Sequence, residues 1–581
     1  MSGGSSCPLD QGNAELRGQA SRFAQLAGLR VVAAGEGGTG LANSPAMALQ
    51  NFPCSWISIV TLAVAATGLL GCNLVTGADD LVLSGAAQSP GDGSDGIGGQ
   101  GVGATGAGAT GSGGSGAYQG GETGAPTEPM ASTEGVIITD IVVYQSVARP
   151  IMQGGSTTSS AIPIVANRDA LIRVFYSADG GYNGQPVTAR LSFGASSPIE
   201  QVETPVGSSS EGTLGSTINF AVPAAQMQSG MTYRVDLLQP VDQVSSDNPA
   251  ARFPTTEGSF EAIPAQVAGN LTITLVPVQY NGDGSGRLPD TSATQLQRYA
   301  DLFFGMYPVS GIDVQVRSQP LSWGSTVAAG GNGWSELLNA VADLRSSDGA
   351  ASNNYYYGIF EPADSFSTYC SGGCVAGLGF VGGPSDSWAH AAIGLGYSGD
   401  MAVETAVHEL GHNHGREHAP CGVSGDPAYP YPGASIGVYG YDLVHGQLYN
   451  PSQFVDMMSY CSPTWISDHN FKAIFDRVKF VNGAQIYTPP ELQNRSYERV
   501  MVNPDGSLTW LAPIVLSRPP IGDATATTVA TVNGPELVTG ALIRYDHIDG
   551  GVLFIPPTAQ PMAPQRAVSA MVDGKWLATG P

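Results

Sequence analysis

Basic residues are scarce in this chain. Lys and Arg together number 23 among 581 residues, against 48 Asp and Glu, so the formal net charge is −25. Because the phosphates of nucleic acids select Lys and Arg, this balance argues against a nucleic-acid partner. Charged residues of either sign are only 12% of the chain, whereas Gly and Pro number 79 and 40. This composition indicates β-rich domains with long connections and argues against a helical bundle.

Long apolar runs are also missing, apart from WISIVTLAVAATGLL at residues 56–70. About fifteen residues match the core of a signal peptide and are short for a membrane span. The run leads into LLGC, which resembles the lipobox of bacterial lipoproteins and implies cleavage before Cys72 with acylation of its thiol. No Lys or Arg occurs in residues 31–55, so a plain secretory signal and a buried core segment remain alternatives.

We therefore expect an exported bacterial protein, either secreted or held at the outer membrane or cell surface by a lipid on Cys72. Residues 1–71 would be an N-terminal extension with the signal segment. Residues 72–134, rich in Gly, Ser, Ala and Thr, are predicted to be a disordered tether. Contact with a membrane would occur only through the lipid, and we expect a monomer.

Histidine is rare, at 8 residues, yet the single segment ETAVHELGHNHGREH holds four of them. The pattern HExxHxxGxxH, typical of zinc hydrolases, is spelled by His408, Glu409, His412, Gly415 and His418. Since His408 and His412 stand one helical turn apart, both imidazoles leave the same helix face. Glu409 is placed as a general base, and Gly415 would turn the chain so that His418 becomes the third ligand. Three ligands leave one tetrahedral position open, as in catalytic zinc sites.

About forty residues later the chain reads VDMMSYC at residues 455–461. Together with the three-histidine motif, this stretch resembles the metzincin clan of zinc peptidases, in which a Met-turn follows the ligands. The resemblance extends to large bacterial secreted or lipoprotein peptidases, including those acting on mucin-type glycoproteins. It implies that Met458, with Met457 as the alternative, forms an apolar floor beneath the metal. It also implies that Tyr460 lies near the metal as a ligand or oxyanion donor, unless it is a core tyrosine.

The folded part of the chain is predicted to be a multidomain α+β protein. Strands of β-branched and aromatic residues separated by Gly, Pro, Asn and Ser predict an immunoglobulin-like β-sandwich over residues 135–265. Over residues 266–480, strands alternate with helices whose apolar residues recur at i, i+3, i+4 and i+7, as in a metzincin-like α/β catalytic domain. Short apolar runs between Pro and Gly turns predict a small C-terminal β domain over residues 481–581.

Cysteine is scarce as well, with 7 residues, of which four lie in the predicted catalytic domain. An even count in an exported domain favours disulfides. Cys421 follows the third histidine and Cys461 follows the tyrosine, so convergence of both motifs on one metal would bring these two close enough to pair. Cys370 and Cys374 would close a small loop. A four-cysteine zinc site is the alternative.

The segment NGDGSGRLPD partly matches a binding loop for a second metal, Ca²⁺. It places Asn281, Asp283, Ser285 and Gly286 like the start of a calcium loop. Position twelve of such a loop carries an acidic residue, and here Ser292 stands in its place. An ordinary Asx turn is the alternative.

The other histidines fall outside the ligand pattern. His414 is out of phase with the ligands and is expected to face solvent or the substrate cleft. His390, His445, His469 and His547 are isolated in sequence, and we expect structural roles for them.

These patterns predict an endopeptidase with one catalytic Zn²⁺, which hydrolyses protein or glycoprotein substrates outside the cytoplasm. The alternative is a surface adhesion or glycan-binding protein whose zinc site is inactive. Self-cleavage and control by a prodomain both stay open.

Overall fold

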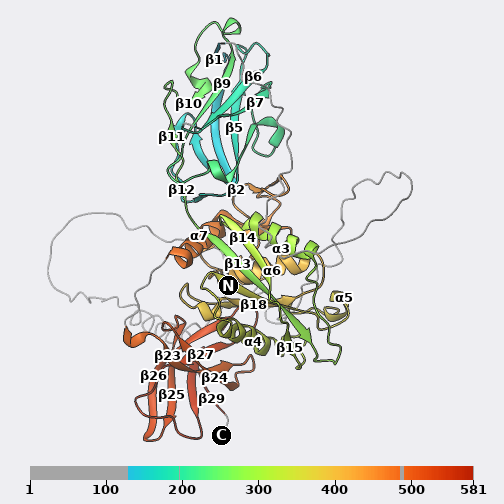
Figure 1. Cartoon of the computed structure of the whole chain (residues 1–581), viewed down its shortest axis with the longest axis vertical. Helices are drawn as coiled ribbons and strands as arrows, with labels where there is room; N and C mark the ends of the chain where they lie inside the picture. The colour runs from blue at the N-terminus through green and yellow to red at the C-terminus, as the bar shows by residue number, and fades with distance from the viewer. Residues whose placement is uncertain (1–128, 195, 484–489, 580–581) are drawn as a thin grey trace, which may run out of the picture. The chain divides into compact units, whose positions relative to one another are not determined.

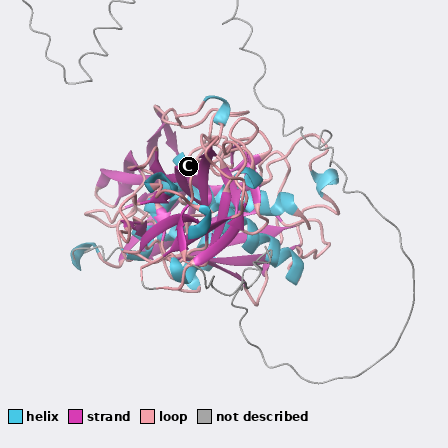
Figure 2. Ribbon diagram, turned by 90° about the horizontal axis from the view of Figure 1, so that it is seen from above, coloured by secondary structure: helices cyan, strands magenta, loops and turns pink. Residues whose placement is uncertain are grey.

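The computed structural model describes residues 129–194, 196–483 and 490–579. The signal segment, Cys72 and nearly all of the predicted tether lie outside these ranges. Strands make up most of the regular structure and helices are few (Figures 1 and 2), so the fold is mixed α+β. Within the described ranges, none of the helices combines the length and apolar character that a membrane span requires.

Two six-stranded sheets contain most strands of the N-terminal part of the described chain, and two later strands, β19 (Gly440–Asp442) and β20 (Gln447–Tyr449), join the second of them. The first contains β1 (Met130–Ser132), β6 (Val187–Ser192), β7 (Ile199–Glu203), β9 (Thr232–Pro240), β10 (Arg252–Phe253) and β11 (Glu261–Ala262). The second contains β2 (Val136–Gln153), β3 (Ser156–Thr157), β5 (Ala170–Ala178), β8 (Ile218–Val222), β19 and β20. A small parallel pair joins β4 (Ile164–Val165) to β12 (Ala265–Gln266).

Alternating burial explains why these two sheets pack together. In β6, Val187, Ala189 and Leu191 are fully buried while the residues between them are partly exposed. These side chains share one apolar core with residues of β2 and β5 from the other sheet, such as Val143 and Ile172. Strands therefore form where the sequence predicted them; the immunoglobulin-like topology stays a prediction.

Regular structure reaches into the last residues of the predicted tether. Residues 130–132, expected in the tether, form β1, which pairs with β9. The next residue, Thr133, is fully buried, and its hydroxyl donates to Gln239 Oε1 at 2.8 Å. Ladder and side-chain hydrogen bonds thus order a stretch whose composition alone indicated a linker.

A thirteen-stranded sheet carries the rest of the chain. Its parallel part contains β13 (Asn270–Tyr280), β14 (Gly311–Val316), β15 (Leu321–Trp323), β16 (Asn354–Phe360) and β18 (Ala391–Leu395). Strand β17 (Gly377–Val381) runs antiparallel beside β18. The helices of this part are α3 (Ala293–Met306), α4 (Trp334–Ser347), α5 (Phe366–Tyr369), α6 (Asp400–Asn413) and α7 (Asp468–Gly483).

Helices cover both faces of this parallel sheet. In β13, Leu271, Ile273 and Leu275 belong to a core shared with α3, α6 and α7. Val276 and Val278, further along the same strand, belong to a second core shared with α4. The strand is therefore buried on both faces, as parallel strands in α/β folds are.

The C-terminal strands extend the same sheet. They are β23 (Arg495–Val502), β24 (Leu508–Leu516), β25 (Asp523–Thr531), β26 (Gly534–Tyr545), β27 (Gly551–Ile555), β28 (Val568–Val572) and β29 (Lys575–Ala578). The sequence predicted a small C-terminal β domain over residues 481–581, and Phe380 and Val381 of β17 pair with Tyr545 and Arg544 of β26. The edge of β17 that faces away from β18 offers backbone hydrogen-bonding groups with which β26 pairs.

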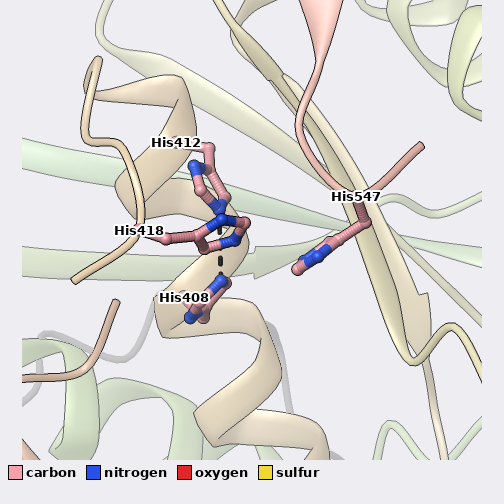
Figure 3. Close-up of side chains that lie close together, drawn as sticks. All are labelled: His408, His412, His418 and His547. Carbon is pink, nitrogen blue, oxygen red and sulfur yellow. Dashed lines mark hydrogen bonds between the residues drawn. The ribbon is translucent and has the colours of Figure 1, made fainter. Parts of the chain in front are cut away.

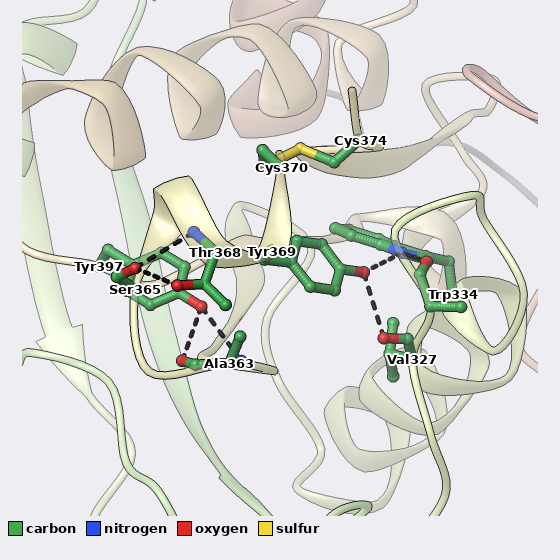
Figure 4. The surroundings of a disulfide bond; sticks show 10 residues. Val327, Trp334, Ala363, Ser365, Thr368, Tyr369, Cys370, Cys374 and Tyr397 are labelled. Carbon is green, nitrogen blue, oxygen red and sulfur yellow. Dashed lines mark hydrogen bonds between the residues drawn. A yellow bond between two sulfur atoms is a disulfide. The ribbon is translucent and has the colours of Figure 1, made fainter. Parts of the chain in front are cut away.

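The disulfide between Cys370 and Cys374 lies between α5 and β17 (Figure 4). Beside it, the hydroxyl of Tyr369 donates to Val327 O at 3.2 Å and accepts from Trp334 Nε1 at 3.2 Å. The loop that leads into β17 is thereby attached to the start of α4.

Candidate metal centre

Helix α6 carries the first half of the site. Val403, Ala406, Val407 and Leu410 are buried in the core, so the opposite side of the helix is free to present polar groups. The helix ends at Asn413, and Gly415 has a φ of +77°, the left-handed conformation expected of it. A Cβ at this glycine would lie 2.2 Å from Arg477 Nη2, so the conformation requires glycine and any larger residue would also displace the guanidinium.

His408 and His412 present their Nε2 atoms to the same point. Nδ1 of His408 donates to Met457 O at 2.8 Å, and Nδ1 of His412 donates to Arg416 O at 2.7 Å. Backbone carbonyls therefore fix the tautomer and leave both Nε2 atoms as lone-pair donors. These two atoms lie 3.1 Å apart. Two zinc-bound nitrogens in a tetrahedral site lie about 3.3 Å apart, so the pair fits a shared metal ion.

His418 completes a three-histidine set (Figure 3). Its ring centroid lies 4.7 Å from that of His412 and 5.3 Å from that of His408. Its Nε2 atom is buried and has no hydrogen-bond partner in the protein. A buried nitrogen without a partner costs free energy unless something else binds it, and a metal ion would supply that partner.

Burial keeps the three imidazoles neutral, which is the form that binds metal. It lowers the pKa of His412 to about 4 and that of His418 to about 3. It also holds the pKa of His408 well below its usual value.

The VDMMSYC segment supplies the floor of the site. Met458 is fully buried, and a Cβ on Gly411 of α6 would lie 2.3 Å from its sulfur. Asp456, also fully buried, accepts hydrogen bonds from Met458 N and Ser467 N, both at 2.8 Å. The methionine thus packs directly against the helix between the two ligand histidines, and a buried carboxylate holds its turn in shape.

Both predicted cysteine pairs form disulfides in the structure. The bond between Cys421 and Cys461 links the segment after His418 to the segment after Tyr460. Beside it, Tyr460 N donates to Cys421 O at 3.0 Å. Covalent and backbone bonds therefore hold the two halves of the site together.

Glu409 lies at the metal side of α6 and is 1% exposed. A Cβ on Gly377 of β17 would lie 2.2 Å from its Oε1 atom, so this glycine makes room for the carboxylate. Burial and the nearby carboxylate of Asp546 raise the pKa of Glu409 well above its usual value. The group is thus a strong proton acceptor once ionised, which suits a general base.

Two residues that the sequence did not single out also line the centre. His547 Nε2 lies 2.8 Å from Glu409 Oε1, and Asp546 Oδ2 lies 3.2 Å from both His412 Nε2 and His547 Nε2. The four histidines, His547 included, bring ligand atoms within 4.8 Å of one another. His547, isolated in sequence and expected to be structural, therefore lies within the candidate centre. No local pattern marks it, because only the pairing of β26 with β17 brings it here.

Charge also concentrates around His547. Although burial opposes its charged form, Asp546 and Glu409 raise the pKa of His547 to about 9. Burial alone would raise the pKa of Asp546, but His547 and His412 lower it below its usual range. The hydroxyl of Tyr460 hydrogen-bonds His547 Nδ1, and the tyrosine itself is 41% exposed rather than a core residue.

The structure also shows the surroundings of His414, of His390 and of the predicted calcium loop. His414, expected to face solvent or the cleft, is buried and stacks on Tyr355 at 4.4 Å between ring centroids. His390 stacks on the same tyrosine at 4.5 Å, in keeping with a structural role. In the loop expected to resemble a calcium site, Asp283 accepts from Ser285 N at 3.0 Å, which makes an Asx turn, and Ser292 caps α3.

Comparison with known proteins gives little beyond this geometry. No family model matches the chain, and no curated protein matches it. A solved structure described as a chaperone-substrate complex is similar at 12% identity and a TM-score of 0.21, covering 46% of this chain and 44% of that chain. Metalloproteinase-II from Bacteroides fragilis is similar at 10% identity and a TM-score of 0.22, covering 54% of this chain and 93% of that chain. The function is therefore inferred from the residues of the site.

Proposed function

We propose that this chain is a zinc-dependent endopeptidase of the metzincin type, which hydrolyses protein or glycoprotein substrates. One observation carries the proposal: the neutral imidazoles of His408, His412 and His418 converge beside the carboxylate of Glu409. Three imidazoles with one open position and an adjacent carboxylate are the requirements of a hydrolytic zinc site.

Each of these protein groups would have its own role in the reaction. A zinc ion held by the three imidazoles would supply Lewis acidity, lowering the pKa of a water to about 7 and polarising a carbonyl. Glu409 Oε2, which has no partner in the protein, would accept the proton of the attacking water. Glu409 would then pass that proton to the amine as the C–N bond breaks. Tyr460, at the exposed rim, would support the oxygen that becomes negative.

We also propose that the enzyme acts outside the cytoplasm as a monomer, either secreted or anchored through a lipid on Cys72. Two disulfides support the location, since such bonds persist mainly in oxidising compartments. Mass spectrometry of the mature N-terminus tests the anchor. A diacylated cysteine at position 72 is expected, and an unmodified N-terminus at another position would refute it.

Glu409→Gln is the decisive variant for the reaction. It keeps the size of the side chain and removes the base, so we expect zinc to stay bound while peptide-bond hydrolysis falls at least a hundredfold. Glu417→Gln is the matched control, since Glu417 is exposed and lies in the same segment. Products from a peptide and glycoprotein mixture are identified by mass spectrometry, with and without a chelator. Wild-type protein that holds zinc, cuts nothing and binds glycans tightly would favour the adhesion alternative.

A further inference from the structure

The loop between β26 and β27 carries Asp546 and His547 into the centre, and the sheet register fixes its position. Tyr545, the last residue of β26, pairs with Phe380 of β17, and Gly379 N donates to Asp546 Oδ1 at 2.9 Å. The loop closes where Tyr545 N donates to Gly550 O at 3.4 Å. The pairing of β26 with β17 and these two hydrogen bonds therefore fix where the loop places His547.

His547 approaches the three ligand histidines from the side opposite α6 (Figure 3). Its ring centroid lies 5.4, 5.7 and 5.2 Å from those of His408, His412 and His418. It thus stands across the open side of the ligand set, where the carbonyl of a substrate must enter.

The partners of His547 assign a hydrogen to its Nε2 atom. This nitrogen faces two carboxyl oxygens, Glu409 Oε1 at 2.8 Å and Asp546 Oδ2 at 3.2 Å, and it donates to whichever of the two groups is ionised, because a carboxylate only accepts. Its other nitrogen is held by the Tyr460 hydroxyl. A nitrogen that carries a proton cannot bind a metal, but it can donate to a developing negative charge.

We propose that His547 is a catalytic residue, which donates a hydrogen bond from Nε2 to the substrate oxygen that becomes an oxyanion. The inference rests on the proposed peptidase function. As the substrate enters, its carbonyl oxygen replaces Glu409 Oε1 as the acceptor, while Glu409 takes the proton of water through Oε2. Water oxygen bonds to the carbonyl carbon, the π pair moves to the oxygen, and His547 stabilises that charge without transferring its proton.

Asp546 acts in this arrangement as a positioning residue. Its side chain is fully buried, one oxygen is held by Gly379 N, and the other lies beside His547 Nε2. It orients the imidazole and does not contact the substrate.

The test compares His547→Ala and His547→Gln with wild type and with His445→Ala. His445 is a histidine with 58% of its side chain exposed, which pairs with Asp442 away from the centre, so its variant should keep full activity. Loss of one oxyanion donor predicts a kcat lower by about 10² to 10³-fold for His547→Ala, with KM within a few fold. His547→Gln, whose amide can donate, should recover part of that loss.

Two readouts separate catalysis from metal binding. Zinc content, and the visible absorption of the Co²⁺-substituted protein, should be the same for wild type and His547→Ala. Affinity for a phosphonamidate peptide, which mimics the tetrahedral oxyanion, should fall by about the same factor as kcat/KM. Loss of zinc or a changed Co²⁺ spectrum would make His547 a ligand, and a rise in activity would make it a blocking group. Either result, or activity within threefold of wild type, overturns the proposal while the peptidase assignment stands. A wild-type protein without peptidase activity would instead refute the assignment itself.

Discussion

The Nε2 atoms of His408 and His412 face each other at 3.1 Å, and the hydrogen of each ring is used on the far side by a backbone carbonyl. Two lone pairs at this distance repel each other unless a cation lies near them. This arrangement of the two imidazoles is therefore unfavourable without a metal ion and becomes favourable when one is bound.

Removal of the metal should lower both stability and activity. A ligand at 100 times its dissociation constant stabilises the native state by about 2.7 kcal/mol, so chelation should reduce the melting temperature by several degrees. Calorimetry with and without chelator measures this shift, and metal analysis should find one zinc per chain. Readdition of Zn²⁺, but not Mg²⁺, should restore the melting temperature. An unchanged melting temperature on chelation would contradict a metal at this site.

Gly411→Ala should damage the floor of the site. The new Cβ would lie 2.3 Å from Met458 Sδ, and overpacking of this kind costs about 1 to 3 kcal/mol. We expect weaker zinc binding as well, because the methionine must shift beneath the ligands. Gly483→Ala is the matched control: it lies at the end of α7, where a Cβ meets no atom within 4 Å, so its stability should change little.

Combining Gly411→Ala with Met458→Ala should recover part of the loss. The smaller side chain removes the clash, so the two changes should be non-additive in denaturant unfolding. Additive losses would show that the methionine and the helix are energetically independent.

The two disulfides should contribute differently to the stability of the protein. Cys421 and Cys461 are 40 residues apart and Cys370 and Cys374 only 4 apart. Loop-closure entropy predicts that replacing the first pair by Ser costs about 4 kcal/mol and replacing the second about 2 kcal/mol. The first replacement should also weaken zinc binding, since that bond joins the two halves of the site. If both replacements change zinc binding equally, either the metal centre lies elsewhere or hydrogen bonds alone hold its two halves together.

Asp386 should make stability depend on pH. Burial raises its pKa to about 6, above the usual value of 3.8. The folded state therefore binds the proton more tightly, and this contribution is complete below pH 3.8 and is lost as pH rises through about 6. The loss is at most about 3 kcal/mol. Unfolding free energies of wild type and Asp386→Asn should diverge across this window, and parallel pH profiles would rule the effect out.

Periodicity and motif spacing predicted much of the structure. Helix α6 follows from the spacing of His408 and His412, and the left-handed Gly415 follows from the need to return the chain toward His418. The pairing of Cys421 with Cys461 follows from their positions beside two motifs that share one metal. The first two are short-range consequences of residue type and helical geometry, and the third follows from the convergence of two motifs that the sequence already shows.

The tertiary structure decided the other side of the centre. His547 follows Glu409 by 138 residues and reaches it only because β26 joins the edge of β17. Strand pairing depends on which edges remain free after the rest of the sheet has formed, and no local pattern records that. Long-range contacts likewise bury His414 against Tyr355 and pair β1 with β9. The sequence thus determined the candidate ligands and the candidate base, whereas long-range packing determined what faces them.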